Sequence, residues 1–520
     1  MKAHLVGGGM ASLAAAAYLI RDGGILATNI TVYEAGERLG GAMTMAGDPA
    51  SGYILPTGRV FEKEYRCTRE FLSLVPSASD PGRSIAEELA AFNARYGYDD
   101  RARIVGRDGR VEPSPHFGLS TRDKLDLVRL ALTPEAMLEG RRIDECFSES
   151  FFGTEFWILW TSMMAFLPQH SAAEMRRYIY RFLHILPDLS TLRTIHRTRY
   201  NQYEDLIKPV AAWLERQGVS FLTGTFVRDV ECKVSSGEIV ANALDYVRDG
   251  AETTVEIGEE DLVLITNGSQ TTDLSFGTAT TPPEPHLEGR SFALWQKLAQ
   301  GRKGFGRPDV FFGPDHVKDT KWVTFTVTTT DPTFFRLIAA LSGSEPGRGG
   351  LMTLKDSHWL VTLVLFHQPE FVDQPSGTMV WWGYGTEPDK IGNVVHKPMS
   401  ECSGAEILRE VLHHFRFEEH LETIMSSSIC IPCLLPYATS ILLPRGRTDR
   451  APVVPEGSVN VGFIGQFAEL PLETAFTMEY SVRSAREAVS SFLKLDVGPP
   501  PVYQGHHDPE ALYNALKVLA

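Results

Sequence analysis

Short apolar runs flank a long apolar stretch at the start of the chain. Residues 4–6 form the first run, and the stretch from Met10 to Leu19 is apolar at nearly every position, as in a buried helix. A second run, Ile30–Tyr33, ends in the acid Glu34. This order of strand, helix and strand predicts a βαβ unit, and therefore an α/β fold with a Rossmann-like domain.

The turn between the first strand and the helix carries the pattern Gly-x-Gly. Gly7 permits a tight turn, and Gly9 has no Cβ, so a pyrophosphate can approach the helix N-terminus. Glu34 is placed to accept hydrogen bonds from an adenosine ribose. Ser12 replaces the third glycine of the motif and is still small enough for close helix–strand packing. The pattern predicts a dinucleotide site, with a purely structural turn as the alternative.

Two further glycine-containing loops follow the acid, at residues 36–42 and 58–65. Paired glycines let backbone amides approach the phosphates and the ring of a flavin. Such loops are common in flavoproteins of the two-dinucleotide-binding type, and two ordinary surface turns are the alternative.

Late in the chain, an apolar run at 459–467 contains Gly465, and a long helix is predicted to begin at Thr477. A strand, a glycine and a helix N-terminus in this order close over a dinucleotide. The predicted cofactor-binding residues are Gly7, Gly9, Ala11, Ser12, Glu34, Arg38, Gly40, Gly41, Gly58, Arg59, Gly465 and Thr477.

Helical periodicity dominates the region that follows. Residues 84–98 and 120–142 are predicted helices of an insertion, and Ser120 begins an N-terminal cap signal. The apolar run from Phe156 to Pro168 is too short to span a bilayer and predicts a buried helix beside an apolar cavity, with a membrane-contacting face as the alternative. Residues 174–185 place Tyr178 on the apolar face of a helix, where a tyrosine is usually a core residue.

A second lobe is indicated by β-rich segments at residues 322–327, 358–365 and 379–382, which predict a sheet under a substrate pocket. The overall expectation is a Rossmann-like FAD-binding domain with a mixed α+β substrate lobe and helical insertions. The predicted bounds are 1–80, 200–275 and 430–495 for the FAD-binding domain, 81–199 for a helical lid, 276–429 for the substrate lobe, and 496–520 for a helical tail.

Composition narrows the class of protein. The 520 residues carry a net charge of −15 without long single-sign blocks, which argues against a nucleic-acid partner. Six scattered cysteines suit a reducing compartment. Cys430-x-x-Cys433 has no second pair and contains a proline, so we expect packing residues rather than a redox pair or half a zinc site. The first strand begins almost at Met1, so we expect no targeting peptide and a cytoplasmic protein.

Several phrases together resemble the oleate hydratases, or fatty acid double-bond hydratases, once called myosin-cross-reactive antigens. The resemblance implies FAD as cofactor and addition of water across a cis double bond of an unsaturated fatty acid, without net redox change. It also implies that Tyr178 occupies the position of the tyrosine that protonates the alkene. The phrases that carry the resemblance are Gly8–Ala16, Met175–Tyr178, Tyr200–Glu204, Cys430–Tyr437 and Phe463–Phe467.

This chain departs from that family's pattern at two places. Val60 stands where the family has the glutamate that activates water, so we expect Glu62, or less readily Glu64, to take that role. The strand that binds the substrate carboxylate also differs, because Val364 and Phe366 replace polar residues there. Glu370 replaces a histidine and, as an acid, is expected to repel a carboxylate. Gln202 survives at another carboxylate-contacting position, and His367 offers a substitute cation.

These observations predict a fatty acid hydratase, a monomer, with Tyr178, Glu62 and Gln202 in the catalytic site. One alternative is a flavin-dependent oxidoreductase or isomerase of a lipid or terpenoid. Another is a lipid-binding flavoprotein that has lost catalysis. The amphipathic helix predicted at 509–518 is expected to dock on the protein surface, with peripheral membrane contact as its alternative role.

Overall fold

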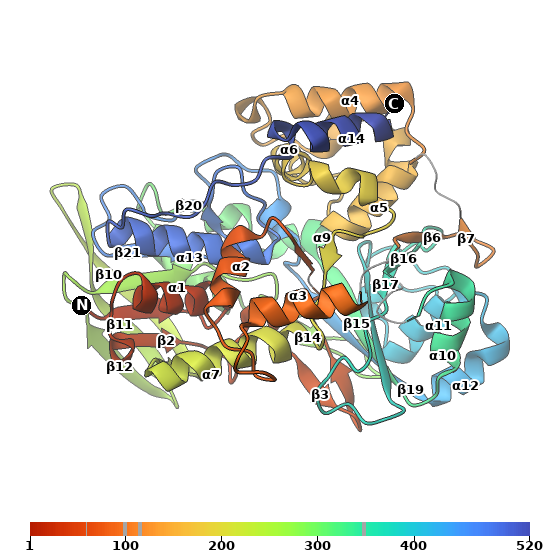
Figure 1. Cartoon of the computed structure of the whole chain (residues 1–520), viewed down its shortest axis with the longest axis horizontal. Helices are drawn as coiled ribbons and strands as arrows, with labels where there is room; N and C mark the ends of the chain where they lie inside the picture. The colour runs from red at the N-terminus through yellow and green to blue at the C-terminus, as the bar shows by residue number, and fades with distance from the viewer. Residues whose placement is uncertain (59, 97–100, 113–116, 346–349, 520) are drawn as a thin grey trace.

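A five-stranded parallel sheet lies at the end of the molecule that holds the N-terminus (Figure 1). The computed structural model describes residues 1–58, 60–96, 101–112, 117–345 and 350–519. All neighbouring strands of this sheet are parallel, and β1 lies at its centre. In order across the sheet, the strands are β21 (Val461–Ile464), β13 (Leu262–Thr266), β1 (Ala3–Val6), β2 (Ile30–Tyr33) and β9 (Ser220–Leu222).

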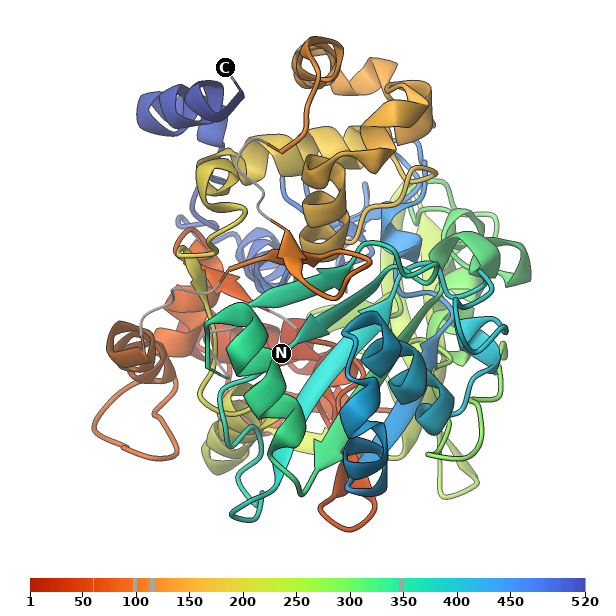
Figure 2. The same ribbon diagram turned by 90° about the vertical axis from the view of Figure 1, so that its right-hand side faces the viewer.

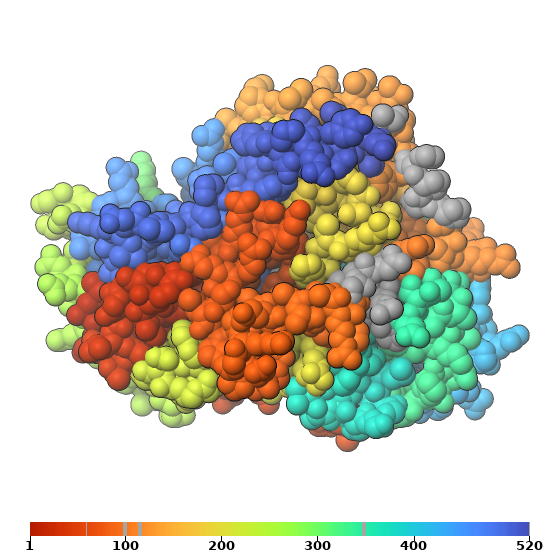
Figure 3. All heavy atoms as spheres, viewed as in Figure 1, coloured from red at the N-terminus to blue at the C-terminus, as the bar shows by residue number. Residues whose placement is uncertain are grey.

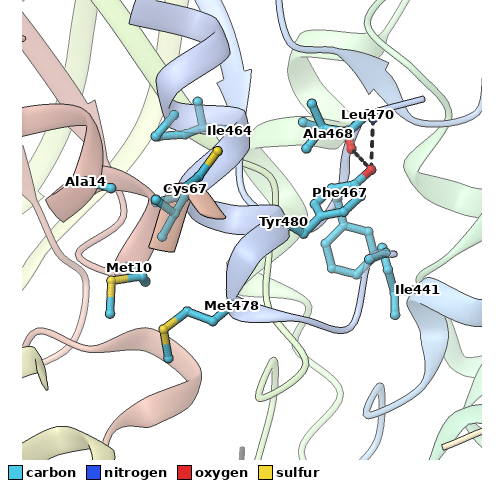
Figure 4. Packing of buried hydrophobic residues seen from close by; sticks show 14 of the residues in the cluster. Met10, Ala14, Cys67, Ile441, Ile464, Phe467, Ala468, Leu470, Met478 and Tyr480 are labelled. Carbon is cyan, nitrogen blue, oxygen red and sulfur yellow. Dashed lines mark hydrogen bonds between the residues drawn. The ribbon is translucent and has the colours of Figure 1, made fainter. Parts of the chain in front are cut away.

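Helices α1 (Met10–Arg21) and α13 (Met478–Phe492) pack against each other beside this sheet. The residues of α1 from Met10 to Leu19 are all buried, which explains why its sequence is apolar on every side. Met10 and Met478 are the first residues of the two helices, and Figure 4 shows both at the same end of the helix pair. The Tyr480 hydroxyl donates to the Ala468 carbonyl at 2.6 Å and accepts from the Leu470 amide, so α13 is tied to the loop before it (Figure 4).

An eight-stranded mixed sheet forms the other half of the molecule. Every residue of its strand β15 is buried, because one face packs toward the parallel-sheet half and the other is covered by helices. Figure 2 shows α10 (Thr333–Ser342) and α11 (Gly404–His414) lying over the outer face. In sheet order, the strands are β14 (Ser275–Phe276), β19 (Ser428–Leu435), β15 (Trp322–Thr329), β18 (Met379–Gly385), β17 (Val361–Val364), β16 (Leu351–Leu354), β6 (Arg103–Val105) and β7 (Val111–Glu112).

A layer of helices lies above both sheets in Figure 1. Ser120 caps α4 with a capping box to Asp123, as predicted, and α4 ends at Leu132 before a proline turn. The C-terminal helix α14, dark blue in Figure 3, lies against the segment Leu183–Asp188 that follows α6. The layer consists of α4 (Thr121–Leu132), α5 (Glu155–Met164), α6 (Ala172–Arg181) and α14 (Pro509–Leu519).

The remaining elements connect these parts. A three-stranded antiparallel sheet, β10-β11-β12, follows β9 directly. A π-helix from Tyr203 to Ile207 runs straight into α7. Their bounds, with those of the other helices, are β10 (Thr225–Ser235), β11 (Glu238–Arg248), β12 (Ala251–Glu256), α2 (Arg66–Ser73), α3 (Ile85–Tyr96), α7 (Lys208–Gln217), α8 (Arg290–Ala299), α9 (Val317–Thr320) and α12 (Leu421–Ser426).

Two features differ from the expected layout. β6 and β7 lie within the stretch predicted as a helical lid, yet they extend the edge of the eight-stranded sheet. Runs of two or three residues are too short to give a period-two pattern, so hydropathy does not predict them. β19 belongs to the same sheet, although residue 430 was the predicted return point to the nucleotide-binding part. A strand that is buried on both faces has a nearly continuous apolar sequence, as strands of parallel sheets do. The sequence of β19 therefore led to its assignment to the parallel sheet.

The two cysteines of the Cys-x-x-Cys phrase lie on β19 and are both buried and free. Residues three apart on a strand point to opposite faces. Cys430 accordingly packs into the core under α11, and Cys433 packs into the other core. Both are packing residues, as expected.

The architecture agrees with the expected α/β class, with a Rossmann-like sheet and a mixed second lobe. Among the described residues, no helix combines the length and the apolar character needed to cross a bilayer.

Candidate active site

A cavity of about 570 Å³ opens at the carboxyl ends of the parallel strands. Gly7 has φ +95°, and a Cβ there would lie 3.1 Å from the Thr266 side chain. A Cβ on Gly41, whose φ is +54°, would lie 3.3 Å from the Cα of Gly9. Glycine is therefore required where the two loops approach each other, and the backbone at the start of α1 stays open to the cavity.

Glu34 closes one end of this cavity. Its carboxylate accepts the backbone N–H groups of Gly8 and Gly36, both at 2.7 Å. Burial raises the pKa of Glu34, and the two amide donors partly offset that rise. The carboxylate is thereby fixed at the end of β2, where it can accept further hydrogen bonds from a ribose.

Most of the predicted cofactor-binding residues gather around this cavity. Ser12 is buried within α1 and is not part of the lining, and Gly58 lines a second cavity instead. Arg59 lies outside the described residues. The predicted residues that line the first cavity are Gly7, Gly9, Ala11, Glu34, Arg38, Gly40, Gly41, Gly465 and Thr477.

Other lining residues were not predicted. Thr266 is the last residue of β13 and Gly268 follows in the next turn, whose small residues were a usable signal. The start of β10, residues 225–227, carries no motif, and neither does Arg290. In the described part of the chain, the Thr266 hydroxyl is buried without a hydrogen-bond partner. α1 has no side-chain cap, so its first amides face the cavity. These donors, together with Glu34, fit the diphosphate and ribose of a dinucleotide.

A second, mostly apolar cavity of about 200 Å³ lies between the helical layer and the eight-stranded sheet. Its walls come from the end of α5, Tyr178 of α6, strands β15 and β18, and residues of the segments 57–58 and 60–65. The buried helix predicted within residues 156–168 and the sheet predicted within residues 322–382 thus both contribute residues to the second cavity. Four residues line both cavities, which therefore adjoin: Met43, Thr44, Thr477 and Met478.

Tyr178 projects from α6 toward this second cavity, and Phe182 and Ile185, which come after the end of α6, line it as well. Its hydroxyl oxygen accepts the backbone N–H of Phe476 at 3.0 Å. Burial raises the pKa of the Tyr178 phenol well above its usual range, and the Phe476 amide opposes that rise. The phenol is therefore protonated at neutral pH, with an amide donor already placed on its oxygen.

One connected ion network holds α6, because Glu469 is paired with Arg177, Arg445 and Arg450. Glu174 is paired with Arg445 at 2.8 Å and with Arg450 at 3.0 Å. Arg177, one turn later, is paired with Glu135 and Glu469. Burial alone would raise the pKa of Glu174, but the surrounding guanidinium groups lower it to about 2. The charged face of α6 is thus anchored, which fixes the direction of Tyr178.

Glu62 lines the second cavity from β5 (Phe61–Glu62). Its Oε1 lies 2.8 Å from Nη1 of Arg181, the last residue of α6. Its Oε2 accepts the Glu64 amide at 2.7 Å and lies 3.3 Å from His184 Nε2. Burial would raise the pKa of Glu62, but the His184 hydrogen bond and the Arg181 charge lower it overall. Glu62 is an ionised carboxylate, while Val60 lines the same cavity without a polar group.

Four further polar side chains of the second cavity come from two segments. Arg197 and Gln202 lie on the chain between β8 (Ile195–His196) and the π-helix. His367 and Glu370 come from the loop after β17. Val364 and Phe366, the apolar replacements noted in the sequence, line the cavity beside them.

Comparison with known proteins places this architecture in context. The chain matches the model of the MCRA family over residues 1–490. It is 34% identical over 528 residues to an oleate hydratase of Streptococcus pyogenes serotype M49 (strain NZ131), which covers 99% of this chain and 89% of that protein. It is 30% identical over 567 residues to a linoleate hydratase of Lactiplantibacillus plantarum, with 100% and 98% covered.

Solved structures show the same fold at low identity. A putrescine oxidase redesigned in its cofactor binding superposes with a TM-score of 0.55 at 12% identity, over 95% of this chain and 98% of that chain. An oxidoreductase from Methanosarcina mazei superposes with a TM-score of 0.50 at 11% identity, over 95% and 100%. Such likenesses concern the fold alone.

Proposed function

The chain belongs to the MCRA family, and from that premise we propose that it is an FAD-dependent hydratase that adds water across a cis double bond of an unsaturated fatty acid. One observation carries the proposal. A protonated phenol, Tyr178, and an ionised carboxylate, Glu62, line one apolar cavity that adjoins the dinucleotide cavity. Alkene hydration needs an acid that protonates the alkene, a group that accepts a proton from water, and room for an apolar chain.

FAD is the proposed dinucleotide. Glu34 would hold the ribose, and the amides at Gly9 and Ala11 would hold the diphosphate. Thr477 and Met478 would lie between the cofactor and the lipid, since they line both cavities. Hydration involves no net transfer of electrons, so it does not require a redox role of the flavin. When bound, the flavin would supply fixed partial charges next to the lipid.

Tyr178 is the proposed acid. Its O–H bond breaks as a C–H bond forms at one alkene carbon, and positive charge develops at the other carbon. The raised pKa opposes this transfer, because burial disfavours the phenolate. The Phe476 amide counters that cost, since it already donates to the oxygen on which the negative charge develops.

Glu62 is the proposed acceptor of the water proton. A carboxylate of lowered pKa is a weak base. Oε2 of Glu62 accepts the Glu64 amide, whereas Oε1 is ion-paired with Arg181 but accepts no hydrogen bond from the described residues. A weak base is sufficient here, because water bound to a cationic carbon becomes a strong acid as the C–O bond forms. The fixed negative charge of Glu62 also favours the developing positive charge nearby.

The proposal is tested by incubating the purified protein with FAD and oleic acid. A product heavier by one water, at unchanged flavin absorbance, is the expected result. Flavin bleaching without an added reductant would indicate hydride transfer, and therefore the oxidoreductase alternative. Tight lipid binding without turnover of any unsaturated acid would indicate a binding protein.

A further inference from the structure

His184 contacts Glu62 from outside the lipid cavity. It belongs to the segment Leu183–Asp188, its side chain is 7% exposed, and it is absent from the cavity lining. Its Nε2 lies 3.3 Å from Oε2 of Glu62. Because an ionised carboxylate can only accept hydrogen bonds, this contact requires a proton on Nε2. In the part of the chain that the structure describes, Nδ1 of His184 is buried without a hydrogen-bond partner. Glu62 is therefore the polar group that orients the His184 ring.

The same contact fixes the direction of the Glu62 carboxylate. Oε1 faces Arg181 at 2.8 Å, and Oε2 is held by the Glu64 amide and by His184. Arg181 is also paired with Glu473 at 3.1 Å and donates to a backbone carbonyl at 3.0 Å, so it has anchors of its own. The Glu64 amide belongs to the same loop as Glu62 and moves with it. His184 instead ties the carboxylate to a different part of the fold.

The connecting segment, residues 493–508, runs from α13 to the C-terminal helix α14 and packs against His184 (Figure 1). The Tyr503 ring stands edge-on to the His184 ring, with the centroids 4.8 Å apart and the planes at 83°. A Cβ on Gly505 would lie 2.7 Å from the Cβ of Leu183, so the two segments approach as closely as glycine allows. Tyr503 thus occupies the space into which the His184 ring would otherwise turn.

Contacts outside the site hold the connecting segment in place. The Pro500 carbonyl accepts a hydrogen bond from the Arg483 guanidinium of α13. The Tyr503 hydroxyl donates to Asp508 at 3.0 Å, and Asp508 also accepts two of the first backbone amides of α14. The position of Tyr503 is therefore set by α13 and α14, and it does not depend on a hydrogen bond to His184.

We propose that His184 is a positioning residue of the hydration site and that the connecting segment acts on the site through it: Tyr503 holds the His184 ring in place, and His184 fixes the direction in which Glu62 presents its carboxylate to water. The inference rests on the proposed function for the role of Glu62. Neither His184 nor Tyr503 lines the lipid cavity, so both act through Glu62 and not on the lipid.

The His184 hydrogen bond also affects the charge of Glu62. It lowers the pKa of Glu62 together with the Arg181 charge, against the effect of burial. Without this donor the Glu62 pKa is expected to rise, so that Glu62 takes up a proton at higher pH. A protonated Glu62 cannot accept the water proton, and the acid limb of kcat therefore moves to higher pH. The charged and titratable groups around Glu62 are Arg181, His184, Glu64, Tyr65, His196 and Tyr503.

The test combines kcat with a direct titration of Glu62. The full chain with FAD hydrates oleic acid at a series of pH values, and infrared difference spectroscopy against Glu62→Gln follows the C=O band of protonated Glu62. His184→Phe keeps an aromatic ring and removes the N–H donor. It is expected to lower kcat about tenfold with little change in KM, and to move both the kcat limb and the infrared titration to higher pH. His184→Gln returns an N–H donor and is expected to restore most of both.

A second variant tests the connecting segment. Tyr503→Leu removes the ring beside His184 and leaves the hydrogen-bond partners of Glu62 unchanged. It is expected to lower kcat about threefold and to add nothing to His184→Phe in the double variant, because Tyr503 acts through His184. Tyr513→Leu is the matched control, since Tyr513 of α14 is 67% exposed. Circular dichroism and the melting temperature verify that each variant folds.

The inference is overturned if His184→Phe keeps the wild-type kcat and the wild-type titration of Glu62, or if His184→Gln loses as much as His184→Phe. Equal effects of Tyr503→Leu with and without His184 would reject the role of the connecting segment. Failure of the proposed function gives a different result. A wild-type protein that does not hydrate oleic acid would reject the hydratase, while the infrared titration still shows whether His184 and Tyr503 hold Glu62.

Discussion

The hydroxyl oxygen of Tyr178 accepts a hydrogen bond from the backbone nitrogen of Phe476, 3.0 Å away. Phe476 directly precedes Thr477, the N-cap residue of α13. Thr477 lines both the dinucleotide cavity and the lipid cavity. The start of one helix therefore contacts the proposed acid and borders both binding sites. Because an amide occupies the phenol oxygen as a donor, the phenol proton is left for another acceptor.

Replacing Tyr178 by phenylalanine is expected to lower the hydration rate about 100-fold or more, because the proton donor is lost. Loss of the hydrogen bond from the Phe476 amide is expected to cost about 1–2 kcal/mol of unfolding free energy. Product formation by mass spectrometry and urea unfolding measure the two effects. Tyr180→Phe is the matched control on the same helix, since the Tyr180 hydroxyl donates to Ala131 outside the cavity. Equal losses in both variants would reject Tyr178 as the acid.

Replacing Gly41 by alanine is expected to abolish tight FAD binding. The new Cβ would lie 3.3 Å from the Cα of Gly9, within the loops that line the dinucleotide cavity. Gly140→Ala is the matched control, because Gly140 also has positive φ, +69°, but open space around the Cβ position. Both variants carry the same backbone strain of about 1 kcal/mol. The flavin-to-protein absorbance ratio after gel filtration is the measurement, and full flavin content in Gly41→Ala would contradict the assignment of this cavity.

The dinucleotide cavity was largely predictable from sequence, because its signal is local. Gly7, Gly9 and Glu34 lie within one βαβ unit, and the positive φ of Gly7 favours glycine at that position. The residues at 225–227 that complete the wall were not predictable. They lie there because β10 follows β9 at the edge of the sheet, and no side-chain type marks that proximity.

The lipid cavity was predictable only in outline. Periodicity places Tyr178 on an apolar face, but its partner is a backbone amide 298 residues away, and any residue type supplies one. The partners of Glu62 cannot be read from the sequence either, although the His184 hydrogen bond and the Arg181 charge together lower its pKa. The same holds for Glu370, because burial and the charge of Asp205, both set by the fold, raise its pKa.

The network around Glu174 is expected to make stability depend on acid pH. The Glu174 pKa is about 2 in the folded protein and close to its ordinary value of 4.5 in the unfolded chain. Its contribution, about 3 kcal/mol, is therefore complete above the ordinary value and is lost as the pH falls toward 2. Urea unfolding across this range in wild type and Glu174→Gln measures it. Glu252→Gln, on an exposed pair with Arg228, is the control that should leave the curve unchanged.

Replacing Glu62 by glutamine is expected to lower hydration about tenfold to 100-fold, because the water proton loses its acceptor. It also leaves Arg181 with Glu473 as its remaining ion-pair partner among the described residues, at a cost of about 3 kcal/mol in unfolding free energy. The loss of the proton acceptor and the loss of stability therefore have to be distinguished by a second variant. Glu473→Gln disturbs the same arginine, but Glu473 does not line the lipid cavity.

Glu473→Gln is therefore expected to lose at least as much stability, because Arg483 also loses a paired carboxylate, while it keeps near wild-type kcat at a temperature where the protein is folded. The comparison isolates the chemistry, because Arg181 loses one carboxylate in either variant. A kcat that falls equally in both variants would mean that Glu62 acts only by holding Arg181 and α6. A kcat that falls only in Glu62→Gln assigns the water proton to Glu62, even though its carboxylate is paired and its pKa is lowered.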